Sequence, residues 1–305
     1  MKSNNITTKD MNREDWVALR QSYIGASDAS AVLGINPWKS PVDVYLEKTG
    51  KVDNGGDSID MWLGREIEPL IAKLFEKNSG LKCRQDFKIR CHPDFDYLRT
   101  NLDRTVGSSP LEIKMMSRFD EIPHHYYVQI MFQAMVTNAP HIYFAVLSTS
   151  IPRSFNWYKY KRDDDLIADI KRECVHFWET YVKGDQMPPP ETERDAKSLY
   201  PIHEPEKEYE ADATIRDDIL LISNLADDIK MKKSELDKAK AGVMDKMKDS
   251  EILTWMGIPM VTWRKTKDGT KFDLNNFRTE NPELYEKYLI EKPGYRRFNI
   301  KGELK

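Results

Sequence analysis

Charged side chains alternate with apolar ones along a predicted hairpin that spans residues 98–115. If the turn of this hairpin centres between residues 108 and 109, Asp103 faces Lys114, and Asp103, Glu112 and Lys114 project from one face. A register shift of one residue would separate them. Two carboxylates held in this way suit Mg²⁺, which prefers oxygen ligands. Such a metal could polarise a phosphate and acidify a bound water, while Lys114 positions that water or stabilises developing charge.

The same spacing of charges is also found on hairpins without a catalytic role, so an exposed, solvated sheet face is the alternative. Ile113 lies between Glu112 and Lys114, which makes the opposite face of this strand apolar. A strand with one apolar face packs against a core. The alternation therefore favours a positioned cluster over a solvated one.

A second group of residues could bind an anion. Arg20 and Ser27 flank a tight segment, residues 23–26, that leads into a predicted helix N-terminus. A guanidinium, a hydroxyl and free backbone N–H groups that converge there would bind a phosphate. The alternative is that Ser27 only caps the helix.

Tyr126, Gln129 and Gln133 share one face of a further predicted helix. This face could order a catalytic site. An amphipathic surface helix would show the same spacing, and the spacing alone leaves both interpretations open.

The composition is that of a soluble, globular chain: 305 residues, 40% of them hydrophobic and 32% charged. No apolar run approaches the roughly 18 residues that span a bilayer, and the polar start of the chain lacks the apolar core of a signal peptide. A cytoplasmic location without a membrane partner is therefore expected. The 47 basic and 50 acidic residues neither support nor exclude a nucleic-acid partner, because a local basic channel can lie in an acidic protein.

The three cysteines are Cys83, Cys91 and Cys174. They are too few and too scattered for a disulfide framework. They also lack the paired spacing of a zinc site and the fourth thiolate of an iron–sulfur cluster. Free thiols are expected.

Helices should dominate the first part of the chain, where capping residues and apolar periodicity coincide. The predicted helices are one capped by Asn12 that ends near Arg20; one over residues 28–33, capped by Ser27 and closed by Gly34; one that begins at Ser40 and stops at Gly50; and one over residues 59–75, which Pro69 should kink or restart. Further along, the predicted strands are residues 87–90, 97–106, 111–115, 142–148 and 155–161, with helices over 124–136 and 165–182. Helices before, between and after a small sheet indicate an α/β sandwich.

Five prolines between residues 187 and 205 mark the expected domain boundary. We expect an N-terminal domain of residues 1–195 and a C-terminal region of residues 206–305. The C-terminal region should contain one long helix, two strands around residue 258, a helix over 275–289 and a final strand that ends at Lys301.

Apolar residues recur every seven positions along the predicted long helix, from Ile215 to Val243. Lys232 and Lys246 occupy the positions that would complete a coiled coil. A helix that packs one narrow apolar stripe is therefore expected.

The sequence resembles a known family, that of the YqaJ-like viral recombinases, relatives of bacteriophage lambda exonuclease in the PD-(D/E)xK restriction-endonuclease-like superfamily. Four blocks carry the resemblance over residues 20–135, and their joint match is far more specific than any single block. They are Arg20 with residues 23–28 (YIGASD) and 33–38 (LGINPW); residues 64–69 (GREIEP); Asp103 with residues 111–114 (LEIK); and residues 126–129 (YYVQ). The resemblance implies a central mixed sheet flanked by helices, with an appended α+β region.

The activity that the resemblance implies is that of a Mg²⁺-dependent DNA exonuclease, in which Mn²⁺ substitutes. It would act 5′ to 3′ on linear duplex ends and leave a 3′ single strand for phage-type recombination. Carried over by position, the implied metal ligands are Asp103, Glu112, the main-chain carbonyl of Ile113, and Glu68. Lys114 would act on the attacking water, and Gln129 and Tyr126 would order the site. The residues that would bind the 5′ phosphate are Arg20, Ser27 and, more loosely, Arg118.

Members of the lambda type form ring-shaped trimers and work with a single-strand annealing protein. A homotrimer, an annealing partner, and a phage or prophage origin within a bacterial host are accordingly expected. Arg104 stands where the family often has a small residue, but its side chain should point to the other face of the strand. Glu66 competes with Glu68 for the metal, and the Glu-Pro pairing favours Glu68.

Two other functions remain as alternatives. One is a RecB-like repair nuclease that cuts single-stranded or branched DNA, although the scattered cysteines argue against its iron–sulfur forms. The other is a non-catalytic DNA-binding adaptor that keeps the fold. The joint presence of Asp103, Glu112 and Lys114 argues against the adaptor.

Overall fold

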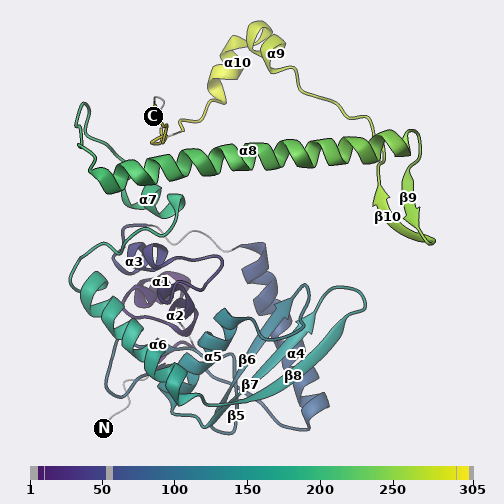
Figure 1. The fold of residues 1–305 in the computed structure, drawn as a ribbon. Coiled ribbons are helices and arrows are strands. Elements are labelled where there is room, and N and C mark those ends of the chain that lie inside the picture. Colours follow the sequence, from purple (N-terminus) through teal and green to yellow (C-terminus); the bar gives the residue numbers. More distant parts are fainter. Residues whose placement is uncertain (1–5, 10, 53–57, 293, 302–305) are drawn as a thin grey trace. The chain divides into compact units, whose positions relative to one another are not determined.

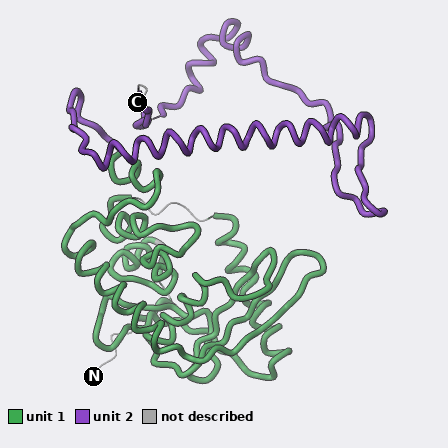
Figure 2. The backbone as a smooth tube through the Cα atoms, viewed as in Figure 1, with its two compact units in different colours: residues 1–200 green, residues 201–305 purple. Residues whose placement is uncertain are grey.

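The computed structural model describes residues 6–9, 11–52, 58–292 and 294–301, and the chain forms two compact units (Figures 1 and 2). The first unit is Met1–Tyr200 and the second is Pro201–Lys305. The first contains a sheet between helices, and the second is built around one long helix (Figure 1).

A five-stranded mixed sheet forms the centre of the first unit, in the order β2-β5-β6-β7-β8. Its strands are β2 (Arg84–Gln85), β5 (Arg104–Val106), β6 (Ser109–Met116), β7 (His141–Ser148) and β8 (Ser154–Lys161). The central pair β6 and β7 is parallel, and the other neighbouring pairs are antiparallel. A parallel pair needs a crossover connection, which α5 (His124–Thr137) provides.

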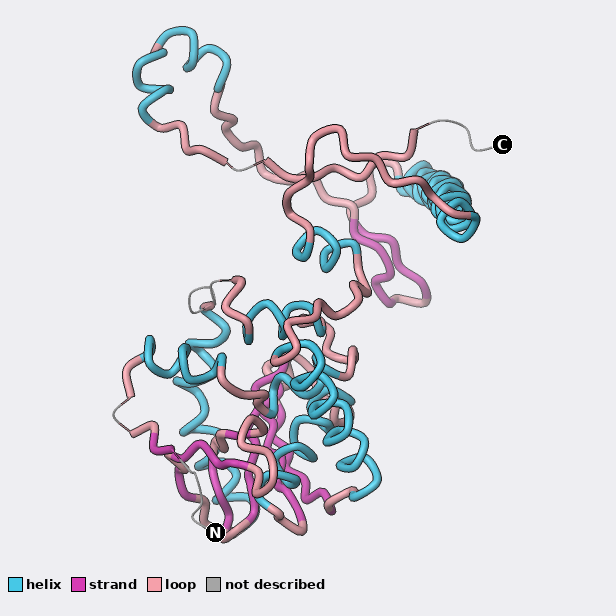
Figure 3. The backbone as a smooth tube through the Cα atoms, turned by 90° about the vertical axis from the view of Figure 1, so that its left-hand side faces the viewer, coloured by secondary structure: helices cyan, strands magenta, loops and turns pink. Residues whose placement is uncertain are grey.

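Helices cover both faces of this sheet (Figures 1 and 3). On one face α4 (Ile59–Ser79) buries Ile71 and Phe75 against Leu111 and Tyr143. On the other face α5 packs on β6 and β7, and α2 (Ala26–Val32) and α6 (Asp164–Phe177) pack in turn on α5. The predicted α/β class, with a central mixed sheet flanked by helices, is confirmed.

Local sequence explains where the first helices begin. Asn12 caps α1 (Arg13–Gln21) and Ser40 caps α3 (Pro41–Lys48), each by accepting a hydrogen bond from the backbone three residues on, at 2.8 Å and 3.1 Å. Both predicted caps are confirmed. The predicted restart at Pro69 is wrong, because α4 continues through it as one helix. The packing of its apolar face on the sheet offsets the lost backbone hydrogen bond.

A second, smaller sheet joins β1 (Ile6–Thr7), β3 (Lys88–Cys91) and β4 (Arg99–Thr100). The prediction of one strand over residues 97–106 is wrong, because this segment divides into β4 and β5. The two strands belong to different sheets, so the chain changes direction between them. Asp103 lies at this break, directly before β5.

The end of the first unit also differs from the prediction. The helix predicted over residues 165–182 is α6, which continues as a π-helical turn, Trp178–Val182. A further short helix, α7 (Glu193–Leu199), was not predicted. Thr192 caps it, and it contacts α3, so part of the proline-rich segment is structured.

The second unit starts with α8 (Ala213–Met247), a 35-residue helix that Figure 3 shows end-on. The predicted long helix is thus confirmed. A hairpin follows, formed by β9 (Ile252–Trp255) and β10 (Ile258–Thr262). The helix predicted over 275–289 is divided into α9 (Leu274–Glu280) and α10 (Pro282–Lys287), because Pro282 cannot continue one helix but readily starts another.

The described residues contain no strand after β10, so the predicted final strand is wrong. None of the helices in the described ranges is long and apolar enough to cross a membrane.

Candidate active site

The hairpin of β5 and β6 turns at residues 107 and 108. Val106 pairs with Ser109, whereas the predicted register placed it opposite Leu111, so that register is wrong by two residues. Gly107 adopts a φ of +61°, a left-handed conformation that glycine readily takes, and this allows the earlier, tighter turn. Because side chains alternate with a period of two, a shift of two residues leaves every side chain on its predicted face.

Asp103 reaches β6 from the bend before β5. Its Oδ2 accepts a hydrogen bond from the backbone N–H of Ile113 at 2.8 Å. The carboxylate is thereby fixed beside the segment of β6 that carries Glu112 and Lys114. This contact does not depend on the pairing of β5 with β6. Asp103 therefore lies beside Glu112 and Lys114, as predicted, although the predicted register of the hairpin is wrong.

Glu112 is buried between β6 and α5, with 2% of its surface exposed. Its Oε1 lies 2.5 Å from Nζ of Lys114 and accepts a hydrogen bond from Nε2 of Gln129 at 2.6 Å. Its Oε2 accepts one from Nε2 of Gln133. The ring of Tyr126 lies beside Lys114, with Nζ 5.1 Å from its centroid. The polar face of α5 therefore contacts the charged cluster and is not a solvent-facing stripe.

Burial and like charge determine the electrostatics of this cluster. Burial raises the pKa of Asp103, the negative charge of Glu112 raises it further, and Lys114 lowers it in part, which leaves this pKa at about 8. Burial opposes the charged form of Lys114, but the charges of Glu112 and Asp103 outweigh it and raise the pKa of the ammonium. The ammonium of Lys114 therefore partly neutralises both Glu112 and Asp103. A second cation at this place would stabilise the ionised form of Asp103.

The donor set suits a divalent cation. Asp103 and Glu112 offer the carboxylate oxygens that Mg²⁺ and Mn²⁺ prefer, and burial together with the nearby charge of Glu112 raises the pKa of Asp103, so a cation bound there would favour its ionised form. Across the described part of the chain, no group of three or more His, Cys, Asp and Glu side chains is arranged to hold a metal ion. A cation between these two carboxylates would need further ligands from main-chain carbonyls, water, or a reoriented Glu68.

Glu68 projects from α4 into a cavity that Asp103, Ile113 and Lys114 also line. Its Oε1 accepts a hydrogen bond from Nε of Arg104 at 3.1 Å and lies 3.0 Å from Nη2 of the same guanidinium. Burial raises the pKa of Glu68, and the charge of Arg104 counteracts this in part. Arg104 points away from the face of Lys114, as the alternation predicts, but the sequence did not reveal that it meets Glu68 there.

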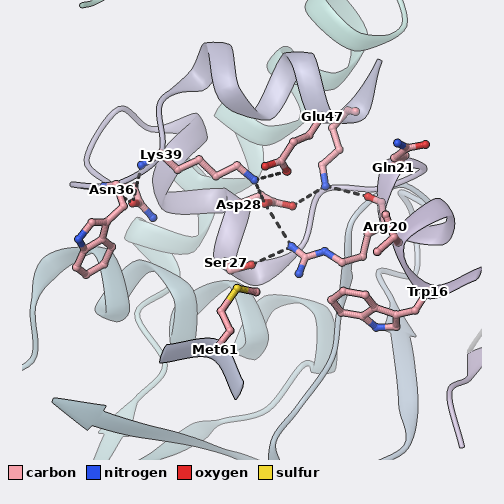
Figure 4. A pocket seen from close by; sticks show the side chains of 12 residues that line it. Trp16, Arg20, Gln21, Ser27, Asp28, Asn36, Lys39, Glu47 and Met61 are labelled. Atoms are coloured by element: carbon pink, nitrogen blue, oxygen red, sulfur yellow. Dashed lines mark hydrogen bonds and ion pairs between the residues drawn. The ribbon is translucent and has the colours of Figure 1, made fainter. Parts of the chain in front are cut away.

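A second cavity lies at the start of α2, where Arg20 and Ser27 point toward each other (Figure 4). Nη2 of Arg20 donates to Oγ of Ser27 at 3.2 Å. The helix begins at Ala26, and Asp28 closes its first turn by accepting from the N–H of Gly25 at 3.0 Å. The prediction that Ser27 caps the helix is wrong, and its hydroxyl contacts the guanidinium instead.

Asp28 is the electrostatic centre of this second cavity, which is named the anion pocket after the ligand predicted for it. Its buried oxygens lie 2.7 Å from Nζ of Lys48, 2.8 Å from Nζ of Lys39 and 3.5 Å from Nη2 of Arg20. Burial alone would raise the pKa of Asp28, but the charges of Lys48, Lys39 and Arg20 hold it well below its usual range. With Glu47 paired to Lys39, three cations face two anions, so the pocket keeps a positive charge.

Lys39 and Lys48 also line this pocket, and the sequence did not indicate either of them as a site residue. Neither belongs to a motif that indicates a phosphate site, and Lys48 lies inside a helix whose buried face is otherwise apolar. Lys48 occupies a position where the helical periodicity of α3 predicts an apolar residue, and this exception could have indicated a buried charge.

Two other candidate residues lie elsewhere. Glu66 is exposed and does not line the cavity of Glu68. The side chain of Arg118 is 78% exposed and lies 3.0 Å from Asp120, and it lines neither this cavity nor the anion pocket. The structure therefore does not bring Arg118 to Arg20 and Ser27.

Solved structures similar to this chain include two exonucleases. An alkaline exonuclease from Laribacter hongkongensis has a TM-score of 0.49 at 19% identity, covering 61% of this chain and 100% of its own. A phage-related exonuclease from Haemophilus somnus 129PT has a TM-score of 0.43 at 13% identity, covering 53% of this chain and 95% of its own.

Sequence comparison identifies the family. The chain matches the YqaJ-like viral recombinase domain over residues 15–140, a range that includes both the charged cluster and the anion pocket. It is 31% identical over 311 residues to the protein YqaJ of Bacillus subtilis (strain 168), a match that covers 96% of this chain and 95% of that protein. The resemblance inferred from the four sequence blocks is thus confirmed, and the chain belongs to the YqaJ-like viral recombinase family.

Proposed function

We propose that this chain is a divalent-metal-dependent exonuclease that degrades linear duplex DNA from its ends, 5′ to 3′, and leaves a 3′ strand for recombination. The observation that carries the proposal is the cluster of Asp103, Glu112 and Lys114, in which a half-buried and a buried carboxylate and an ammonium meet beside a cavity. This combination suits metal-assisted hydrolysis of a phosphodiester. Membership of a viral recombinase family supports DNA as the substrate.

Each residue of the cluster has a distinct role in this proposal. Asp103, Glu112 and the carbonyl of Ile113 would hold a divalent cation, and such a cation would supply Lewis-acid activation of the scissile phosphate and of the attacking water. Lys114, held between Glu112 and the ring of Tyr126, orients the attacking water or stabilises the charge that develops on the phosphate. The two glutamine amides of α5 fix the orientation of Glu112.

The anion pocket supports a preference for a 5′ phosphate. Its net positive charge attracts a phosphate, and the Arg20 guanidinium and the Ser27 hydroxyl can both donate hydrogen bonds to phosphate oxygens. A terminal phosphate held there would place the 5′ end of one strand in the pocket and the next phosphodiester toward Lys114. The 5′-to-3′ polarity itself is taken from the family resemblance, and a 5′ phosphate held in this pocket would agree with it.

The assembly and the partners belong to the same proposal and rest on the family resemblance. A ring-shaped homotrimer would enclose the duplex, and a single-strand annealing protein would receive the 3′ strand. We place the protein in the cytoplasm of a bacterial host, encoded by a phage or prophage.

The proposal is tested by an assay that varies both the divalent metal and the form of the DNA substrate. With Mg²⁺ or Mn²⁺ the purified chain should degrade 5′-phosphorylated linear duplex and spare closed circles, and EDTA should stop the reaction, as followed by gel electrophoresis. Equal attack on circles would contradict end dependence. Preference for single-stranded or branched DNA would favour a RecB-like nuclease, and no metal-dependent cleavage of any form would favour a non-catalytic adaptor.

The Arg20→Ala variant tests the anion pocket. It should lose most of the preference for a 5′-phosphorylated over a 5′-hydroxyl duplex, because the main phosphate donor is gone, with a loss of about 10-fold or more in that ratio. Degradation rates on the two duplexes give the ratio directly. Arg172→Ala, which removes an exposed arginine of α6, is the matched control and should keep it. An unchanged preference in Arg20→Ala would remove the pocket from end recognition.

A further inference from the structure

Trp38 presents an exposed aromatic ring that connects the anion pocket with the catalytic cluster. It is 65% exposed and lines the same cavity as Arg20. Its ring meets the ring of His125 edge-on, with centroids 4.9 Å apart, and lies 6.4 Å from that of Tyr126. The ring of Tyr126 is the one beside Nζ of Lys114. A short series of ring contacts therefore leads from the pocket to the catalytic lysine.

The backbone around Trp38 is held in place although the ring is exposed. Oδ1 of Asn36 accepts hydrogen bonds from the N–H groups of Trp38 and Lys39, at 2.9 Å and 3.1 Å. Nδ2 of Asn36 donates to Oγ of Ser30 in α2 at 3.0 Å, and Lys39 is paired with Asp28. These contacts tie the turn to the anion pocket, so the ring is preorganised relative to a bound phosphate.

An exposed tryptophan with a fixed backbone, next to a positively charged pocket, could bind the two parts of a nucleotide, its base and its phosphate. The pocket supplies charge for the phosphate, and the ring supplies a face for the base, since aromatic side chains stack on bases without regard to sequence. A ring left in water contributes little to folding compared with a buried one. Exposed tryptophans also occur at protein interfaces, but an adjoining positive pocket is not needed there.

We propose that Trp38 is a base-stacking platform for the terminal nucleotide whose 5′ phosphate lies in the anion pocket. This assignment rests on the proposed exonuclease function and deepens it. The phosphate and the stacked base together would hold the terminal nucleotide at two points, with its 3′ phosphodiester toward Lys114. Because stacking is tolerant of base identity, such a subsite suits an enzyme that must accept every sequence in turn.

The experiment uses the full chain in EDTA, so that binding is measured without cleavage. The DNA is a 5′-phosphorylated duplex with 2-aminopurine either as the 5′-terminal nucleotide or at an internal position. The wild type and Trp38→Phe should quench the terminal 2-aminopurine, whereas Trp38→Ala should lose the quenching and bind the duplex end about 5- to 150-fold more weakly, the range for one stacked base. Trp255→Ala, which removes a tryptophan of the second unit with 67% exposure, is the matched control and should behave as the wild type.

The outcomes separate the stacking role from the proposed function. Terminal quenching that persists in Trp38→Ala overturns the stacking role, and cleavage of the same duplex by the wild type in Mg²⁺ leaves the exonuclease function standing. Loss of quenching to the same extent in Trp255→Ala, or unchanged DNA binding with an altered sedimentation coefficient in Trp38→Ala, also overturns it. A wild type that neither binds nor cleaves linear duplex overturns the exonuclease function and the stacking role together.

Discussion

Replacement of Lys114 by alanine is expected to reduce cleavage of linear duplex DNA by about 10³-fold, the loss typical of a group that stabilises charge in the transition state. The ammonium is the cation in direct contact with Glu112, and the methyl group of alanine can neither orient a water nor neutralise a developing charge. Binding of DNA should stay near that of the wild type, because phosphate contacts at the anion pocket are unaffected. Single-turnover cleavage in Mg²⁺ and fluorescence anisotropy in EDTA measure the two quantities.

A matched control exists on the neighbouring part of the sheet. Nζ of Lys159 lies 5.7 Å from the centroid of the Tyr143 ring, much as Nζ of Lys114 lies 5.1 Å from that of Tyr126. Lys159→Ala removes a comparable lysine–ring contact at a place that does not line the cavity of the cluster, so it should cleave normally. Cleavage by Lys114→Ala within about 10-fold of the wild type would exclude Lys114 from the chemistry.

Replacement of Asp28 by alanine is expected to cost about 3–5 kcal/mol of unfolding free energy, the usual loss when one partner of a buried ion pair is removed. The carboxylate is 1% exposed and neutralises Lys48, whose side chain is buried equally deeply. Without Asp28 the ammonium of Lys48 has no compensating charge at this contact. Urea unfolding of the full chain, followed by tryptophan fluorescence, measures the change.

The stabilisation by Asp28 should also depend on pH in a defined direction. The folded-state pKa of Asp28 is lowered, so its contribution is fully present above the unfolded pKa of about 4 and is lost as the pH falls through the folded pKa. The gap between the wild type and Asp28→Asn should therefore shrink below pH 4. Asp169→Ala, which removes an exposed partner of Arg172, should cost less than about 1 kcal/mol. An equal cost for both aspartates would show that the Asp28 network is not stabilising.

Arg104 stands where the family often has a small residue, and only part of its environment could be predicted from the local sequence. Alternation along the strand correctly predicts that Arg104 points away from the face of Lys114. Its partner there, Glu68, comes from α4, 36 residues earlier in the chain, and no local pattern connects the two. The consequence is functional: as the structure stands, Glu68 is held by Arg104 and does not complete a three-carboxylate group with Asp103 and Glu112.

The hairpin illustrates why an incorrect register still placed the charged cluster correctly. The turn lies earlier than predicted because Gly107 accepts a left-handed conformation, and local sequence allowed both turns. The resulting shift of two residues preserves the faces of the strand. Asp103 is independent of the pairing altogether, because its side chain bonds to the backbone of Ile113.

By itself, the sequence determined the family, the caps at Asn12 and Ser40 and the shared face of Glu112 and Lys114. These features depend on residue type and on spacing within one element, which backbone geometry converts directly into structure. Only the tertiary structure decided that three cations surround Asp28, and that the exposed ring of Trp38 lies both at the anion pocket and beside Tyr126, the ring next to Lys114. Those contacts join different elements, and the packing of helices on the sheet brings them together, so no periodicity along the chain encodes them.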